Sequence, residues 1–144
     1  MAAGKHALTV PLALAAIWLL SASLSALAVP VIIATVPYWH EVRVHLAQIG
    51  LWQTWISIAA CVVLLSLSRK KHAETEEGWA QGALLIYVLG GVVTAVLLNY
   101  GVLPRWLVQS ASFVLTAQVV AVMLLHWCCA ALTLRSLLAY RKQT

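Results

Sequence analysis

Charged residues are scarce in this sequence: Asp, Glu, Lys and Arg make up 9% of its 144 residues, whereas hydrophobic residues make up 63%. Soluble domains carry about 25% charged residues, which keep their surface in water. The charges that are present lie outside four continuous apolar runs and interrupt none of them. The composition therefore excludes an ordinary soluble domain and predicts an integral membrane protein.

Catalytic motifs are also absent from the sequence. It has no GxSxG, no HExxH and no glycine-rich phosphate loop, and no Asp, Glu, Lys or Arg lies inside an apolar run to relay protons or couple ions. Haem is not expected, because two axial ligands must approach one iron from opposite faces and His126 is the only histidine inside a run. We therefore predict a protein that is not an enzyme and has no cofactor.

The apolar runs predict an all-α, integral membrane four-helix bundle that forms a single domain. A membrane helix needs about 20 apolar residues. Strands are not expected, because transmembrane barrels show alternating rather than continuous hydrophobicity. The predicted spans are 9–36, 46–68, 79–103 and 106–134, with the last connection at Pro104 and Arg105.

Basic residues near the ends of the runs predict the orientation. Cytoplasmic loops are rich in Lys and Arg, so the more basic side is expected inside and both termini are predicted to be cytoplasmic. We expect a multi-pass protein of a bacterial inner (plasma) membrane. The basic residues of the inner side are Lys5, Arg69, Lys70, Lys71, Arg135, Arg141 and Lys142, and those of the outer side are Arg43 and Arg105.

Aromatic residues are expected to mark the two interfaces, because amphipathic rings prefer the depth of the lipid headgroups. The outer set is larger than the inner one. It consists of Tyr38, Trp39, Trp52, Trp55, Tyr100 and Trp106.

A polar stripe runs along the fourth predicted span. Its members fall within about 120° of one another at about 100° per residue. Ionisable groups inside a membrane usually turn inward and are often functional, so His126 is either part of a functional path or a histidine hydrogen-bonded to a neighbouring helix. The stripe consists of Gln109, Ser112, Thr116, His126 and Thr133.

A cluster of candidate metal ligands lies in the first connection, where His40, Glu41 and His45 fall within six residues. Glu41 and His45 would share one face if this segment were helical, and imidazole and carboxylate groups both bind metals. The HxxxxH spacing is not a recognised metal motif. A metal site here is therefore one of two alternatives, the other being ordinary polar residues at an interface.

Small residues in the third predicted span indicate close helix packing. Gly90, Gly91, Thr94 and Ala95 lie within two turns, and Gly91 and Ala95 form a small-xxx-small pair. Such positions let helix backbones approach each other where lipid removes the usual hydrophobic drive for association.

The order of these features resembles the small four-helix membrane proteins similar to transmembrane protein 205. The resemblance rests on Ala16-Ile17-Trp18 in the first run, on the segment 98–105 that ends the third run, and on Leu125-His126-Trp127 in the fourth. The family's usual glycine pair after the tryptophan is absent here. The resemblance implies a four-helix fold and a role for His126, and it implies no particular activity.

Three functions from different classes stay open. The one we favour is a non-catalytic accessory or structural subunit that packs against a larger membrane protein complex. The second is a small homo-oligomeric channel or carrier lined by the polar stripe, and the third is metal or redox handling at the His40 cluster. In each case the lipid bilayer surrounds the protein, and the net charge of +5 needs no nucleic-acid partner because topology and anionic lipids explain it.

Overall fold

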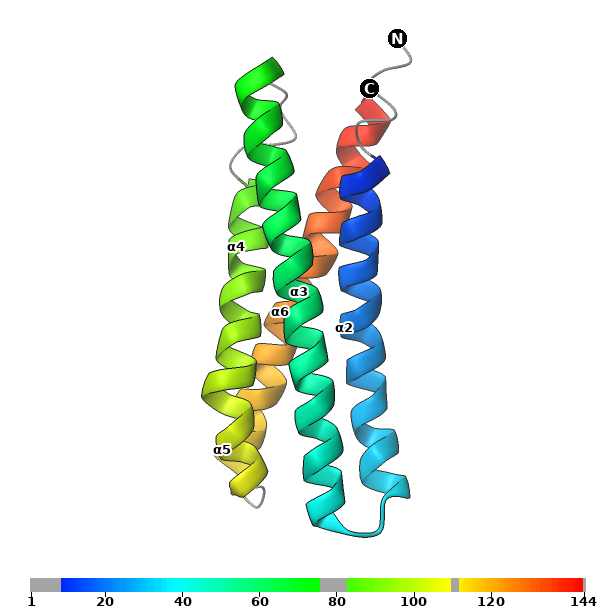
Figure 1. The fold of residues 1–144 in the computed structure, drawn as a ribbon, viewed down its shortest axis with the longest axis vertical. Coiled ribbons are helices and arrows are strands. Elements are labelled where there is room, and N and C mark those ends of the chain that lie inside the picture. Colours follow the sequence, from blue (N-terminus) through cyan, green and yellow to red (C-terminus); the bar gives the residue numbers. More distant parts are fainter. Residues whose placement is uncertain (1–8, 76–82, 110–111, 144) are drawn as a thin grey trace.

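The computed structural model describes residues 9–75, 83–109 and 112–143, and all long elements in these ranges are helices (Figure 1). The chain runs through α2 (Thr9–Thr35) and α3 (Trp39–Thr75), and then through α4 (Ala83–Val96), the π-helical segment η2 (Leu97–Val102) and α5 (Leu103–Val108), before it ends in α6 (Phe113–Gln143). The predicted all-α class is confirmed. Within the described ranges, four helices are long and apolar enough to cross a membrane, with α4, η2 and α5 together forming the third.

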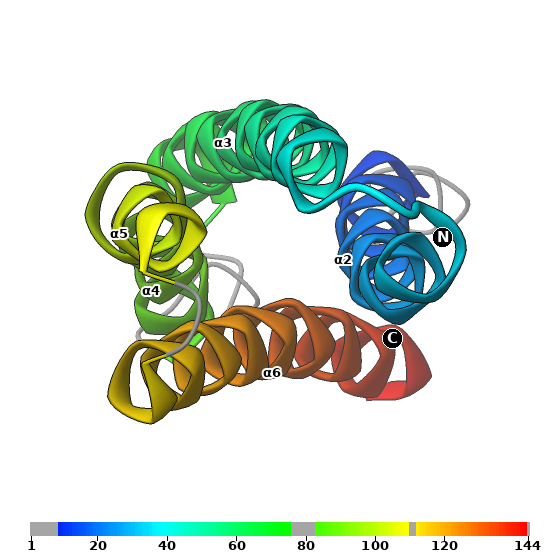
Figure 2. The same ribbon diagram turned by 90° about the horizontal axis from the view of Figure 1, so that it is seen from below.

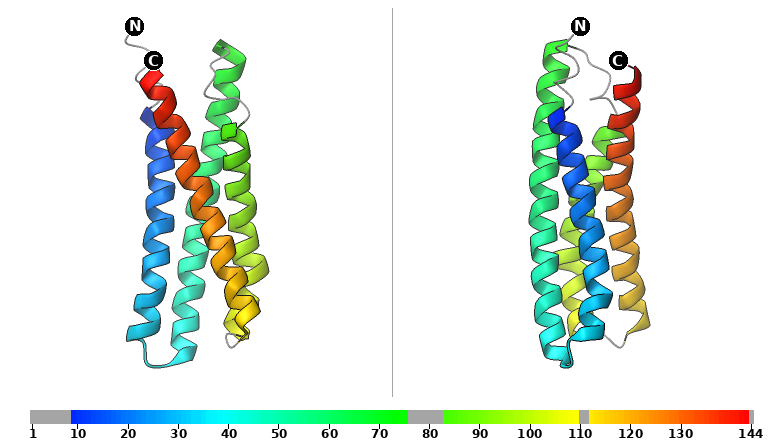
Figure 3. Two further views of the ribbon diagram at one scale, coloured as in Figure 1. Left: turned by 180° about the vertical axis from the view of Figure 1, so that it is seen from behind. Right: turned by 90° about the vertical axis from the view of Figure 1, so that its right-hand side faces the viewer.

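The helices form a closed ring when they are seen along the bundle axis (Figure 2). The helix α2 packs against α3 and α6, and α4 packs against the same two helices, so α2 and α4 lie diagonally opposite each other. The helix α6 is tilted: it starts beside α5 and ends beside the first turns of α2 (Figure 3). This tilt separates α6 from α2 at the end of the bundle where α2 finishes.

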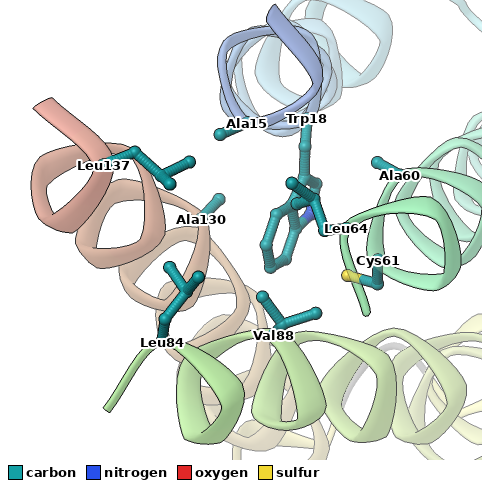
Figure 4. Packing of buried hydrophobic residues seen from close by; sticks show 9 residues of the cluster. All are labelled: Ala15, Trp18, Ala60, Cys61, Leu64, Leu84, Val88, Ala130 and Leu137. Atoms are coloured by element: carbon teal, nitrogen blue, oxygen red, sulfur yellow. The ribbon is translucent and has the colours of Figure 1, made fainter. Parts of the chain in front are cut away.

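Two clusters of buried side chains fill the bundle, one towards each end. The first surrounds Trp18, which is fully buried and points from α2 into the space between the other three helices (Figure 4). The second lies where α3 begins and contains Val42, Leu46, Leu98, Leu103, Trp106 and Val119.

Proline 104 lies inside the third long helix, where the sequence predicted a turn. A proline has no backbone N–H, and its ring clashes with the carbonyl group four residues earlier in an α-helix. The chain widens into η2 just before this point, and the backbone N–H of Leu103 donates to the carbonyl of Leu98, five residues earlier. Pro104 then lies in the first turn of α5, where a missing N–H costs little.

The third helix therefore continues to Val108, and α6 begins at Phe113. The predicted spans 79–103 and 106–134 differ from the observed helices at this connection, because the connection lies between Val108 and Phe113 instead of at Pro104. The predicted start of the third span, Trp79, lies outside the described residues.

The second helix also begins earlier than the predicted span 46–68. The carbonyl of Tyr38 accepts hydrogen bonds from the backbone N–H groups of Glu41 and Val42, which starts α3 at Trp39. The carboxylate of Glu41 lies in the first turn, where the helix dipole favours negative charge. Consequently the first connection is only a few residues long, and the segment 40–45 is helical.

Gly91 of α4 makes room for the Trp18 ring. A Cβ atom built on Gly91 would overlap the Cζ2 and Cη2 atoms of Trp18 and would also lie 3.4 Å from the Sγ atom of Cys61. Because α2 and α4 lie diagonally opposite each other, the Trp18 indole crosses the interior of the bundle and contacts the backbone of α4 at Gly91. The small residue therefore accepts a side chain from across the bundle instead of a close helix backbone.

We expect Gly91→Ala to lower the free energy of unfolding by about 1–3 kcal/mol, because the added methyl group has to displace the buried Trp18 ring. Denaturation in detergent micelles with increasing SDS measures this change. Gly101→Ala is the matched control, since its Cβ would meet only Leu97 Cδ2 at 3.9 Å, and alanine is the better helix former by about 1 kcal/mol. Equal stability of the two variants would contradict the packing described here.

Candidate functional site: the His126 network

His126 is the polar residue on which the four long helices converge. It lies on α6, its side chain is 3% exposed, and its ring is contacted by polar groups from α2, α3 and α4. The Nε2 atom lies 3.0 Å from the indole nitrogen of Trp18 and 3.0 Å from the hydroxyl of Ser57. The Nδ1 atom lies 3.0 Å from the hydroxyl of Thr94 and 3.2 Å from the carbonyl oxygen of Gly91.

The partners of the ring determine its protonation state. An indole N–H only donates, so Nε2 of His126 must accept the hydrogen bond from Trp18 and carries no proton. The carbonyl of Gly91 only accepts, so Nδ1 must carry a proton and donate it. The hydroxyl of Thr94 donates to the Gly90 carbonyl at 2.8 Å and thereby accepts from the same Nδ1–H. His126 is therefore a neutral imidazole in its Nδ1–H form.

The network extends from Ser57 along α3 and back to α2. The side-chain amide of Gln53 donates from Nε2 to the Ser57 hydroxyl at 3.1 Å, and its Oε1 atom accepts from the Ser25 hydroxyl at 3.0 Å. The Ser57 hydroxyl has one hydrogen, which the Gln53 carbonyl at 2.7 Å and the Nε2 atom of His126 at 3.0 Å share. Trp18 and Ser25 therefore link α2 to two separate points of the same chain of hydrogen bonds.

All buried side-chain nitrogen and oxygen atoms in the described part of the chain have a hydrogen-bond partner. Unpaired polar groups are costly in an apolar interior, and fully satisfied networks specify one packing arrangement. The members of the His126 network are uncharged, and both ring nitrogens are engaged. The arrangement suits a role in fixing the four helices relative to one another.

The predicted polar stripe is divided by the structure. Gln109 is exposed at the C-terminal end of α5, outside the fourth helix. The Ser112 hydroxyl accepts from the Leu115 backbone N–H at 3.5 Å, as an N-cap residue does. Thr116 accepts from the indole N–H of Trp106 at 3.0 Å, and only His126 belongs to the central network.

The remaining stripe residue, Thr133, is fully buried and donates to the Cys129 carbonyl within α6. The five stripe residues therefore have different local roles, and only His126 takes part in the central network. They do not line one continuous path in a single chain.

The candidate metal ligands all lie on the exposed first turns of α3. The Nε2 atom of His40 is 3.9 Å from Oε1 of Glu41, with side chains 72% and 48% exposed, and His45 is exposed as well. Within residues 9–75, 83–109 and 112–143, no group of three or more His, Cys, Asp or Glu residues is placed to hold a metal ion. The structure therefore does not assemble the predicted cluster into a ligand set.

The predicted packing residues of α4 lie beside the network. Gly91 and Thr94 contact the His126 ring, and Ala95 is buried at 2% exposure. A Cβ on Gly90 would lie 3.2 Å from the Sγ atom of Cys129 on α6. These small residues thus contribute polar contacts as well as close packing.

Sequence reasoning missed three members of the site: Trp18, Gln53 and Ser57. Trp18 entered only through the family resemblance, and the other two received no role. One pattern does indicate them, because Gln53 and Ser57 are polar residues four positions apart within an apolar run, and such a pair shares one helix face. Polar residues in an apolar run are expected to face other helices.

Comparison with known proteins gives no relative for this arrangement: no protein-family model, curated protein or solved structure matches the chain. The resemblance to proteins similar to transmembrane protein 205 stays a prediction.

The hydrogen bond between Trp18 and His126 should appear as an energetic coupling between the two residues. We expect Trp18→Phe and His126→Leu each to destabilise the fold, and the double variant to lose less than the two single losses together, by about 0.6–1.7 kcal/mol. A double-mutant cycle from SDS denaturation measures this value. Trp106→Phe is the matched control, because it also removes an indole N–H bonded at 3.0 Å, but one that donates to Thr116. A coupling to His126 as large for Trp106 as for Trp18 would contradict the assignment.

The protonation form of His126 is a second testable point. In protein with 15N-labelled histidine, we expect the Nδ1 resonance of His126 to be that of a protonated ring nitrogen and the Nε2 resonance that of an unprotonated one. Comparison with His126→Leu assigns the signal among the five histidines. A proton on Nε2 would be incompatible with the Trp18 hydrogen bond and would overturn the network described above.

Proposed function

We propose that this chain is a multi-pass membrane protein that serves as a non-catalytic accessory subunit, packing against a larger membrane protein through Trp52 and Trp55 of α3. The observation that carries the proposal is the depth and exposure of these two side chains. They are 69% and 56% exposed, and they lie near the middle of the candidate span Trp39–Arg69.

This depth is unusual for tryptophan that faces lipid. Because α3 begins at Trp39, Trp52 lies roughly 20 Å further along the helix at about 1.5 Å per residue, instead of at the outer interface where the sequence placed it. Tryptophan prefers the headgroup region, where its N–H meets water. Two outward tryptophans at mid-span are better explained by a protein surface that covers them.

The indole N–H groups strengthen this argument. Neither Trp52 nor Trp55 has a hydrogen-bond partner among the described residues. By contrast, the indole N–H groups of Trp18, Trp106 and Trp127 each donate to a side chain of another helix. A buried indole N–H usually finds an acceptor. A carbonyl or hydroxyl group of a partner helix would supply it, and tryptophan is enriched among residues that dominate protein interfaces.

Basic residues support an orientation with both termini in the cytosol. Arg69, Arg135, Arg141 and Lys142 lie at the end of the bundle where α3 and α6 finish, whereas Arg43 and Arg105 lie at the opposite end (Figure 1). The more basic side is the cytoplasmic one by the positive-inside rule. The expected membrane is a bacterial inner membrane.

The neutral, fully bonded His126 favours the accessory role over the alternative of a channel. A path for ions or polar solutes needs polar groups that remain free to exchange water, whereas both nitrogens of this ring hold other helices. A homo-oligomeric channel would require a path between chains, lined by outward residues that are mostly large and apolar.

We expect extraction into native nanodiscs to give a complex that contains this chain and a larger protein in a fixed ratio. The double variant Trp52→Ala with Trp55→Ala should lower the affinity for that protein about tenfold or more, because exposed tryptophans of an interface carry much of its energy. Mass determination of the intact assembly measures both results.

The matched control is Ile86→Ala with Leu89→Ala on α4. These side chains are 68% and 52% exposed and have the same spacing, so the variant removes a similar apolar face elsewhere on the bundle. The proposal fails if the chain is found alone or only as a homo-oligomer, or if the two double variants dissociate the complex equally.

A further inference from the structure

The tilt of α6 separates it from α2 at one end of the bundle (Figure 3). An apolar groove lined by residues of both helices lies there. It contains a cavity of about 510 Å³ and, deeper in the bundle, a second of about 220 Å³. The two cavities share six lining residues and are therefore adjacent, and together they are called the recess below. The shared residues are Ser25, Val29, Gln53, Leu98, Val120 and Met123.

The recess is mainly apolar, and Gln53 is the amide side chain that lines it. Gln53 lines both cavities and its side chain is 6% exposed. Its amide has two N–H donors and an oxygen with two lone pairs, but it uses one donor on Ser57 and one lone pair for Ser25. One donor and one acceptor site of a buried amide therefore remain for a group that enters the recess.

The walls of the recess carry no charge. None of the residues that line the two cavities is Asp, Glu, Lys or Arg, and His126 is held neutral by its own hydrogen bonds. A phosphate or carboxylate group would lose its hydration without gaining a counter-charge, which is costly. The chemistry of the recess thus suits a long apolar chain with an uncharged, hydrogen-bonding head.

The volume of the recess favours such a ligand over a transmembrane helix of another protein. One turn of an α-helix with its side chains occupies roughly 400–600 Å³ at a diameter of about 10–12 Å. The larger cavity would therefore hold about one helical turn, whereas a membrane helix has about 20 residues. Small-molecule sites have volumes of about 300–1,000 Å³. The recess has the size of a small-molecule site.

We propose that the groove between α2 and α6 binds a neutral single-chain lipid of the monoacylglycerol type, whose hydroxyl or ester head reaches Gln53 and whose chain lies along α2 and α6. This inference does not depend on a partner protein, because every lining residue belongs to this chain.

Purified protein in detergent tests the proposal with two probes that share one acyl chain, 1-monooleoylglycerol and 1-oleoyl lysophosphatidic acid, and with native mass spectrometry as the readout. We expect the neutral probe to bind in a one-to-one complex and the phosphate to bind at least tenfold more weakly. Equal binding of the two probes, or binding of neither, would overturn the proposal.

Two substitutions locate the site. Ala26 lines the larger cavity on α2, and Ala26→Trp should fill it and lower the affinity for monooleoylglycerol at least tenfold. Leu27→Trp is the control, because Leu27 is 66% exposed on α2 and lines none of the described cavities. If both variants bind equally well, or if Ala26→Trp instead dissociates an oligomer, the groove is not a lipid site.

The role of the head group is tested by Gln53→Met, which keeps the length of the side chain and removes its amide. We expect a three- to tenfold loss of affinity for monooleoylglycerol, which corresponds to one hydrogen bond, and no loss for 9-octadecene, which has no head. Helix content and denaturation by SDS show whether the variant is folded. A folded variant with unchanged affinity for monooleoylglycerol would show that Gln53 does not bind the head.

Discussion

The hydrogen bond from the Trp18 indole to His126 is the interaction on which the arrangement of the bundle depends. It joins α2 to α6 at 3.0 Å in an interior without water or charge, and it fixes the histidine as the neutral Nδ1–H form. That form in turn donates to the Gly91 carbonyl of α4. Because the indole must pass between the helices to reach His126, α4 has to offer a residue without a side chain at that level. The indole N–H of Trp18 thus determines the protonation state of His126, requires glycine at position 91 and sets the spacing of α2, α4 and α6.

The sequence predicted the four apolar helices because continuous hydrophobicity over about 20 residues has few other structural solutions. It predicted the last connection at Pro104 instead of after Val108, because hydropathy contains no information about backbone hydrogen bonds. The widening at η2, which lets the third helix pass Pro104, depends on one bond from Leu103 to Leu98. The early start of α3 was missed for a similar reason: Glu41 and its neighbours are polar, yet they are favourable in the first turn of a helix.

The candidate site was predictable only in part, because the residues of one helix identify a polar face but not what that face meets. His126 was found from its own run, and Thr94 and Gly91 were found as small packing residues. Their contact with His126, and the bonds to Trp18 and Ser57, are tertiary facts that no spacing within one helix encodes. Gln109 shows the opposite error. It shares the angular position of the stripe only if it belongs to the same helix as the other members, but α6 begins at Phe113 and Gln109 lies at the end of α5.

The network also divides the bundle into two unlike halves. On one side the Trp18 ring fills the interior and the buried cluster around it is closed. On the other side α6 leans away from α2, and the second cluster borders the recess: Leu98, Leu103 and Val119 belong to both. The tryptophan of the second cluster, Trp106, lines the smaller cavity. Gln53 lies at the boundary, bonded to Ser57 on the filled side and left with spare hydrogen-bonding capacity towards the open one. Occupation of the recess would therefore act on the same hydrogen bonds that hold the four helices together.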